Sequence, residues 1–97
     1  MPDKEKIKHV LDFLANGRTC DYAPVQGGVL IIIDNRKQMW ESVDIETFLE
    51  LRNSKYIDMN PKETLHIWHP IFRPSFQNPI NIYRITEKGR NYLKSEK

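Results

Sequence analysis

The sequence has a single cysteine, Cys20, and no long apolar run. One cysteine cannot form a disulfide within the chain. The longest apolar run, residues 29–33, is far shorter than the ~20 residues that a helix needs to span a bilayer. Charged residues between Asp3 and Lys8 stand where a signal peptide would carry an apolar segment. These absences predict a protein of the reducing cytoplasm with no membrane partner.

Charge of one sign is also scarce, because the formal net charge is only +2 over 97 residues. So small a charge does not by itself indicate a nucleic-acid partner, and its distribution matters more. Five basic and two acidic residues lie in 84–97, whereas four acidic and two basic residues lie in 44–58. The C-terminal part of the chain is therefore basic, and its middle is acidic.

Apolar residues are frequent enough to form a core. They make up 39% of the chain against 29% charged residues, which excludes a disordered chain and a disulfide scaffold. A chain of this length can bury one modest core. We therefore expect a single domain over residues 1–97.

Residues 3–16 have the pattern of an amphipathic helix. Asp3 is a candidate cap, and Asn16-Gly17 is a stop signal. Apolar residues recur between them at the spacing of one buried stripe, and these are Ile7, Val10, Leu11 and Leu14.

The next segment, residues 18–43, predicts a β-hairpin. Residues 29–33 are mostly β-branched and favour a buried strand. Residues 34–37 are a turn signal, and residues 38–43 can return as the partner strand.

A second helix is expected over residues 44–53, with Asp44 as its cap. The residues expected to face inward are Ile45, Phe48, Leu49 and Leu51. Those expected to face outward are Glu46, Thr47 and Glu50.

Three strands and a helix are predicted after residue 55. The strands lie near 56–59, 65–72 and 80–85, and the last two would form a hairpin with a proline-bounded tip. Thr86 is a candidate cap for a helix over residues 87–95. Gly89 would allow another element to approach that helix closely.

Residues 48–57 and 83–93 together resemble small winged-helix regulators of the MarR and PadR type. The resemblance covers residues 45–94 and, less closely, 1–17, but not 18–43. It implies an α+β, winged-helix-like domain whose second helix is replaced by an extra N-terminal β-hairpin. Residues 45–53 would be the recognition helix, and the 65–85 hairpin the wing. Lys55 stands where the family has a glycine, so either the turn differs or Asn53 takes the left-handed position.

No residue pattern indicates catalysis or a cofactor. His66 and His69 would lie on opposite faces of a strand, and no further ligand completes a metal set. Asp21 should raise the pKa of the Cys20 thiol, so we expect Cys20 to be a small apolar residue. Gly27-Gly28 is not followed by the residues of a phosphate loop. We expect no enzyme, no cofactor and no small-molecule substrate.

Aromatic and basic residues alternate around the predicted wing. Trp68, Phe72, Phe76 and Tyr83 could stack on bases, or they could pack as one face of a sheet. We expect core packing for Trp68 and Tyr83, and less so for Phe76 at the tip.

Two functions fit these observations. The first is a DNA-binding transcription regulator that contacts duplex DNA through Arg73, Arg84, Lys88 and Arg90. Acidic Glu46 and Glu50 on the recognition helix oppose it, because DNA phosphates would repel them. The alternative is a small bacterial, phage or mobile-element protein-interaction module or inhibitor. It would bind a protein partner or a second copy of itself through Glu46, Glu50 and Phe76.

Overall fold

The structure of the protein, a computed structural model, describes residues 3–34 and 36–95. These residues form three α-helices and one short 3-10 helix, which are α1 (Lys4–Ala15), α2 (Ile45–Asn53), η1 (Pro61–Glu63) and α3 (Glu87–Ser95). They also form five strands, which are β1 (Cys20–Ala23), β2 (Gly28–Asp34), β3 (Met39–Ser42), β4 (Ile57–Met59) and β5 (Asn81–Ile85). None of the helices in these two ranges is long and apolar enough to cross a membrane.

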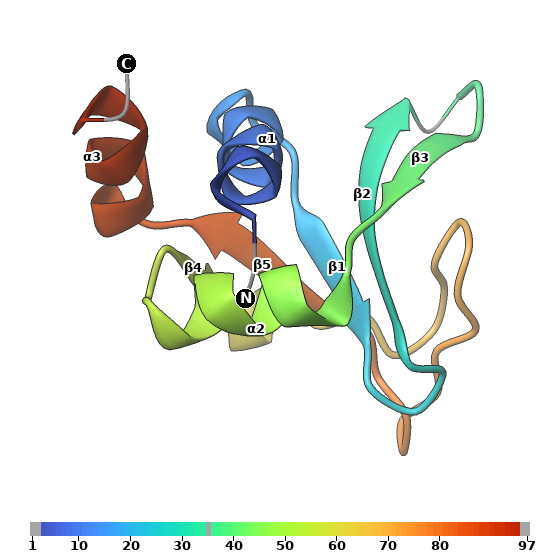
Figure 1. Cartoon of the computed structure of the whole chain (residues 1–97). Helices are drawn as coiled ribbons and strands as arrows, with labels where there is room; N and C mark the ends of the chain where they lie inside the picture. The colour runs from blue at the N-terminus through green and yellow to red at the C-terminus, as the bar shows by residue number, and fades with distance from the viewer. Residues whose placement is uncertain (1–2, 35, 96–97) are drawn as a thin grey trace.

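All five strands belong to one antiparallel sheet in the order β3-β2-β1-β5-β4 (Figure 1). The α+β class is confirmed, and the strands predicted near 29–33, 38–43, 56–59 and 80–85 correspond to β2, β3, β4 and β5. The sequence does not predict β1, because Asp21 and Ala23 are residue types that strands disfavour. Long-range pairing with β2 and β5 therefore fixes this strand.

The two faces of the sheet are covered differently. One face contributes Cys20, Ile31 and Tyr83 to the main core, where they pack beneath the helices. Phe48 of α2 is completely buried there, with its ring centroid 4.7 Å from that of Tyr22 and 5.0 Å from that of Tyr83. The opposite face carries a second, smaller core, formed by Ala23, Ile80 and Ile82.

Helix α1 agrees with its prediction. The carboxylate of Asp3 accepts a hydrogen bond from the backbone N–H of Glu5 at 2.9 Å. Gly17, just beyond the helix, has a φ of +89°, which glycine adopts without strain. The predicted stripe is buried in the main core, and its members are Ile7, Val10, Leu11 and Leu14.

Helix α2 has the predicted bounds, but its orientation differs from the prediction. Phe48 and Leu51 are buried as expected, whereas Ile45 is 45% exposed. Thr47, expected to face outward, is buried instead. Because α2 packs against α1, β2 and β4 together, the inward face is set by these neighbours and not by the apolar residues alone. Asp44 occupies the cap position, but its carboxylate makes no capping bond and instead pairs with Lys6 Nζ at 2.6 Å.

The turn after α2 uses Lys55 in the left-handed conformation, with a φ of +63°. Asn53 remains the last residue of the helix. Neither predicted alternative is therefore correct, because Lys55 itself takes the left-handed position of the turn and Asn53 does not.

The last helix also agrees with its prediction. Thr86 Oγ1 accepts a hydrogen bond from the Gly89 N–H at 3.1 Å, which confirms the cap. A Cβ atom at Gly89 would lie 2.8 Å from Ile85 Cγ1 and still closer to the carbonyl oxygen of Tyr56. Gly89 is therefore required for packing, as predicted.

The strand predicted over residues 65–72 is wrong. Only an isolated bridge joins Leu65 to Ile80, so the predicted hairpin ladder does not form. Pro70 and Pro74 cannot donate to a ladder, and the N–H groups of Ile71 and Phe72 are bonded to a histidine ring instead. The segment is an irregular loop.

Candidate interaction surface

Residues 64–79, here called the aromatic loop, connect η1 to β5 and lie on the sheet face opposite the helices. In Figure 1 the loop is at the lower right, beside the turn between β1 and β2. Leu65 and Ile80 exchange two backbone hydrogen bonds of 3.0 and 2.9 Å at its base. Half-buried Leu65 and Phe72 pack on the smaller core. The loop is thus the cover of this sheet face.

His69 anchors the loop to β1. Its side chain is completely buried, and Nε2 lies 2.7 Å from Oδ2 of Asp21. Its Nδ1 accepts hydrogen bonds from the backbone N–H groups of Ile71 and Phe72, both at 3.0 Å. Because Nδ1 accepts, the ring proton of the neutral imidazole must be on Nε2, which donates it to Asp21.

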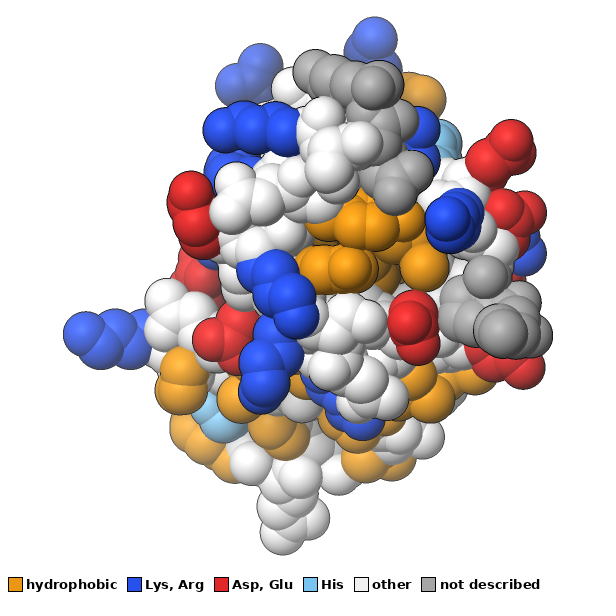
Figure 2. Space-filling model, turned by 60° about the vertical axis from the view of Figure 1, so that its left-hand side comes forward, with side chains coloured by type: hydrophobic (Ala, Val, Ile, Leu, Met, Phe, Trp, Pro, Cys, Tyr) orange, Lys and Arg blue, Asp and Glu red, His pale blue; other side chains and the backbone are white. Residues whose placement is uncertain are grey.

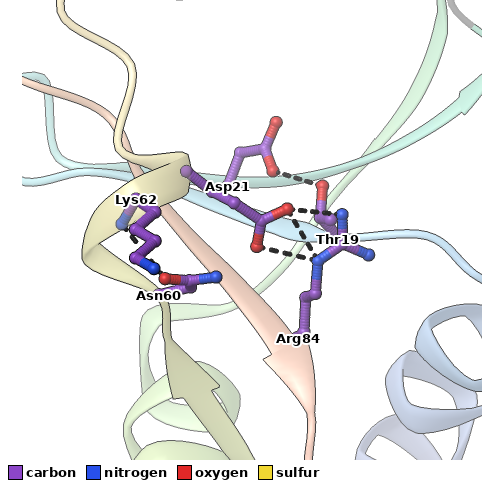
Figure 3. Close-up of polar contacts among 6 residues, drawn as sticks. Thr19, Asp21, Asn60, Lys62 and Arg84 are labelled. Carbon is purple, nitrogen blue, oxygen red and sulfur yellow. Dashed lines mark hydrogen bonds and ion pairs between the residues drawn. The ribbon is translucent and has the colours of Figure 1, made fainter.

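The carboxylate of Asp21 is itself held in place. Its Oδ1 accepts a hydrogen bond of 2.8 Å from the hydroxyl of Thr19 (Figure 3). Since Oδ2 is paired with His69, both oxygens have partners. Asp21 is 4% exposed, and a carboxylate at that depth is stabilised only when it is hydrogen-bonded. The contact between His69 and Asp21 could not be predicted from local patterns, because 48 positions separate the two residues in the chain.

The anchor holds the loop and has no group free for chemistry. Both nitrogens of His69 are occupied, so neither can take a proton from a substrate or bind a metal ion. Within residues 3–34 and 36–95, no group of three or more His, Cys, Asp or Glu side chains could hold a metal. Cys20, on the neighbouring position, is completely buried, and burial and then Asp21 raise the pKa of its thiol, as expected.

The loop is also fixed to the turn between β1 and β2. Gln26 Nε2 donates a hydrogen bond of 3.0 Å to the carbonyl oxygen of Arg73. The ring of Phe72 lies against Gly28, where a Cβ atom would come within 2.8 Å of it. These contacts hold the middle of the loop at the end of the sheet that carries the β1–β2 turn.

The tip of the loop is a tight turn that presents Phe76. Ser75 and Asn78 exchange backbone hydrogen bonds of 3.1 and 3.2 Å, and the Ser75 hydroxyl accepts a further bond from the Asn78 N–H. The Phe76 ring is stacked on His66, with centroids 5.5 Å apart, although the residue is 79% exposed. Nδ1 of His66 is buried and has no hydrogen-bond partner among the described residues.

Large apolar side chains are exposed elsewhere on the loop and on the adjacent β1–β2 turn. Ile67 is 83% exposed and Trp68 63%, and Val25 on the adjacent turn is also exposed. The expectation that Trp68 packs in the core is wrong, whereas the same expectation for Tyr83 is confirmed. Figure 2 shows hydrophobic side chains gathered near the lower end of the molecule, where Figure 1 places the loop. We call Val25, Ile67, Trp68 and Phe76 the apolar surface.

The four basic residues predicted to bind DNA do not lie together. Arg73 is exposed on the aromatic loop, whereas Lys88 and Arg90 belong to α3. The loop precedes β5 and α3 follows it, so the two lie at opposite ends of this strand (Figure 1). In the view of Figure 2, basic and acidic side chains are interspersed.

Arg84, between these two groups, is already paired. Its Nε and Nη2 donate to the Glu63 carboxylate at 2.8 and 2.6 Å, close to Thr19 and Asp21 (Figure 3). The hydrogen bond from Arg84 lowers the pKa of Glu63. The pair therefore stabilises the fold at pH values above the ordinary pKa of a glutamate. This stabilisation is lost when the pH falls far enough to protonate Glu63 in the folded state.

The predicted partner-binding residues fall on two different surfaces. Glu46 and Glu50 are exposed on α2, which covers the main core. Phe76 is exposed on the aromatic loop, on the other side of the sheet. One flat partner surface cannot contact both.

No protein-family model, curated protein or solved structure matches the chain.

Proposed function

We propose that this chain is a small protein-interaction module that binds a protein partner through the apolar surface of its aromatic loop. The observation that carries the proposal is the exposure of Trp68. Trp68 is 63% exposed, although the side chain of the next residue, His69, is completely buried. Tryptophan, other aromatic residues and arginine are the side chains that dominate binding at protein interfaces. Trp68, Phe76 and Arg73 are all exposed on the loop.

The rigid attachment of the loop supports this role. His69, Gln26 and the Leu65–Ile80 bridge fix the loop at separate points. A loop that is already ordered loses less conformational entropy on binding than a flexible one, so more of the contact energy remains as affinity. The loop is therefore already ordered before a partner binds.

The partner is a protein with apolar pockets for Trp68 and Phe76 and an acidic group near them. The acidic group follows from Arg73, which is exposed on the same loop. Ion pairs at the rim of an interface orient the partners and add specificity, whereas buried aromatic groups supply most of the affinity.

We also propose a winged-helix-like frame for the domain. Helix α2 leads directly into β4, β4 pairs with β5, and β5 pairs on its other side with β1. The aromatic loop then stands where the resembled regulators carry their wing. The β2–β3 hairpin stands where their second helix would lie.

DNA binding has less support than protein binding. Of the predicted contacts, Arg84 is paired with Glu63, and the others are divided between two ends of β5. Exposed Glu46 and Glu50 would face the duplex if α2 entered a groove.

The proposal is tested by measuring how two single substitutions change partner affinity. Proteins captured by the chain from extracts of its source cells would be purified, and their affinity measured by calorimetry. For a partner bound through the loop, Trp68→Ala should weaken binding about 30-fold, the effect of a typical hot-spot residue. Ile67→Ala should also weaken it.

Ile45→Ala is the matched control, because Ile45 is an exposed isoleucine on α2. Its affinity should equal that of the unmodified chain. A partner whose affinity is unaffected by Trp68→Ala and Ile67→Ala would contradict the proposal, as would an equal loss in all three variants.

A further inference from the structure

Strand β3 forms an open edge of the sheet. It pairs with β2 alone among the described strands, in the register Leu30↔Ser42 and Ile31↔Glu41. The N–H of Val43 donates to the carbonyl oxygen of Val29 at 2.9 Å. Because backbone direction alternates along an antiparallel pair, Glu41 also faces β2. The N–H and C=O groups of Trp40 and Ser42 therefore point away from the sheet.

The other edge of the sheet is closed by its own residues. In β4, the same alternation turns the N–H of Met59 outward, because Asn60 donates to Ile82. That N–H is bonded to Oδ1 of Asp58 at 3.0 Å, and Pro61 lies two residues further along the chain. Exposed strand edges normally carry such protection, often as charge or proline.

Strand β3 has neither of these features. Its residues are Met39, Trp40, Glu41 and Ser42, with neither lysine nor proline among them. The carboxylate of its one charged residue, Glu41, is held by His9 of α1 at 2.8 Å. Met39 is 49% exposed and Trp40 45%. Among the described strands, β3 is the last one at this edge of the sheet.

We propose that β3 pairs antiparallel with β3 of a second copy of the chain, so that two sheets join into one continuous sheet. The outward-facing groups of Trp40 and Ser42 would then donate to and accept from the second copy. This inference is independent of the aromatic loop, which contributes nothing to the β3 edge.

Charge favours one register for this pairing. A two-fold axis at Glu41 would place two glutamates directly opposite each other, which is unfavourable. An axis at Trp40 instead places Trp40 opposite Trp40 of the second copy and Met39 opposite Glu41. The edge therefore points to an isologous dimer centred on Trp40.

Cysteine cross-linking tests this register. Opposed hydrogen-bonded residues have Cα atoms about 5.5 Å apart, within the range of a disulfide, so Trp40→Cys should give a covalent dimer under mild oxidation. Ser42→Cys is the matched control on the same strand. Its Cα atoms would be about 14 Å apart across the axis, so it should remain monomeric on a non-reducing gel. Native Cys20 is completely buried and should not interfere.

Sedimentation of variants tests the pairing itself. The unmodified chain should sediment as a dimer at tens of micromolar. Ser42→Pro should sediment as a monomer with an unchanged circular dichroism spectrum, because proline is tolerated where the N–H faces away from the sheet. Trp40→Lys, which leaves every backbone group in place, should also reduce the dimer at least tenfold.

Three results would overturn the inference: a monomeric unmodified chain at several hundred micromolar, a dimer that persists in both variants, or cross-linking of Ser42→Cys as efficient as that of Trp40→Cys. A dimer that dissociates with Trp68→Ala but not with Ser42→Pro would place self-association on the aromatic loop instead.

Discussion

Lys55 has a φ of +63°, a left-handed conformation that costs a residue with a side chain about 1 kcal/mol. The surrounding hydrogen bonds explain why the turn tolerates it. The N–H of Tyr56 donates to the carbonyl oxygen of Leu51 at 3.0 Å, and the Thr86 hydroxyl donates to the carbonyl oxygen of Lys55 at 2.6 Å. The turn is therefore fixed from α2 on one side and from the start of α3 on the other.

Replacing Lys55 by glycine should stabilise the protein by about 1 kcal/mol, because glycine adopts this conformation without strain. Urea denaturation measures the change. Lys55→Ala is the control, since it removes the same charged side chain but keeps the Cβ atom. If the two variants have equal unfolding free energies, the backbone at Lys55 is not strained.

Gly89→Ala should destabilise the protein by about 2 kcal/mol, since overpacking a closed contact typically costs 1–3 kcal/mol. The added methyl group would collide with Ile85 and with the carbonyl oxygen of Tyr56. Thermal unfolding measures this loss, and Lys94→Ala, at an exposed position of the same helix, serves as control. A melting temperature for Gly89→Ala equal to that of Lys94→Ala would show that α3 can move away from the turn.

At the scale of the elements, the helices could be predicted because their signals are local. The stripe from Ile7 to Leu14 and the cap at Thr86 each lie within a few residues of the structure that they specify. β2 was equally clear from its β-branched run. The orientation of α2 could not be predicted, because its tertiary neighbours bury the polar residue Thr47 and leave the apolar residue Ile45 exposed.

The aromatic loop could not be predicted for a different reason. Its alternating apolar residues are typical of a strand, and only Pro70 and Pro74 opposed that interpretation. The decisive contact joins His69 to Asp21 in a strand that was itself unpredicted. Because the orientation of the loop follows from this contact, local sequence patterns do not show that Trp68 is exposed.

His69→Ala should loosen the loop. The N–H groups of Ile71 and Phe72 would lose their acceptor, and Asp21 would remain buried without its main partner. We expect amide hydrogen exchange at these two residues to accelerate at least tenfold, while exchange in α1 changes much less. Asp21→Asn is a milder variant, because it keeps a hydrogen-bond acceptor for His69.

His66→Ala is the control for this experiment, since His66 makes no hydrogen bond to the backbone of residues 71 and 72 among the contacts described. Exchange at Ile71 and Phe72 should stay slow in that variant. Unchanged exchange in His69→Ala would mean that other contacts hold the loop and that the anchor is dispensable.

At the scale of the whole molecule, the distribution of charge and apolar surface separates the two proposed functions. The net charge is only +2, and the predicted basic contacts lie at two ends of β5. Trp68 and Phe76, in contrast, are exposed on one loop on one side of the sheet, although Trp40 is also exposed, on β3. A duplex needs a continuous basic surface, whereas a protein partner needs a compact apolar one.

We therefore expect no saturable binding of duplex DNA at about 50 µM protein in ~0.1 M salt, measured by fluorescence anisotropy. Saturable binding would favour the DNA hypothesis instead. In that case Arg73→Ala or Arg90→Ala should reduce the slope of log affinity against log salt concentration by about 1, the value for one phosphate contact. Arg84→Ala should have a smaller effect, because Arg84 is paired with Glu63.

The most direct test of the central claim is a hydrogen-exchange footprint of the chain bound to a purified partner protein. If the aromatic loop is the binding surface, slowed exchange should be concentrated in residues 64–79 and in the β1–β2 turn at residues 24–27. Helices α2 and α3 should exchange as in the free chain. Protection confined to α2 or α3, with residues 64–79 unchanged, would contradict the account.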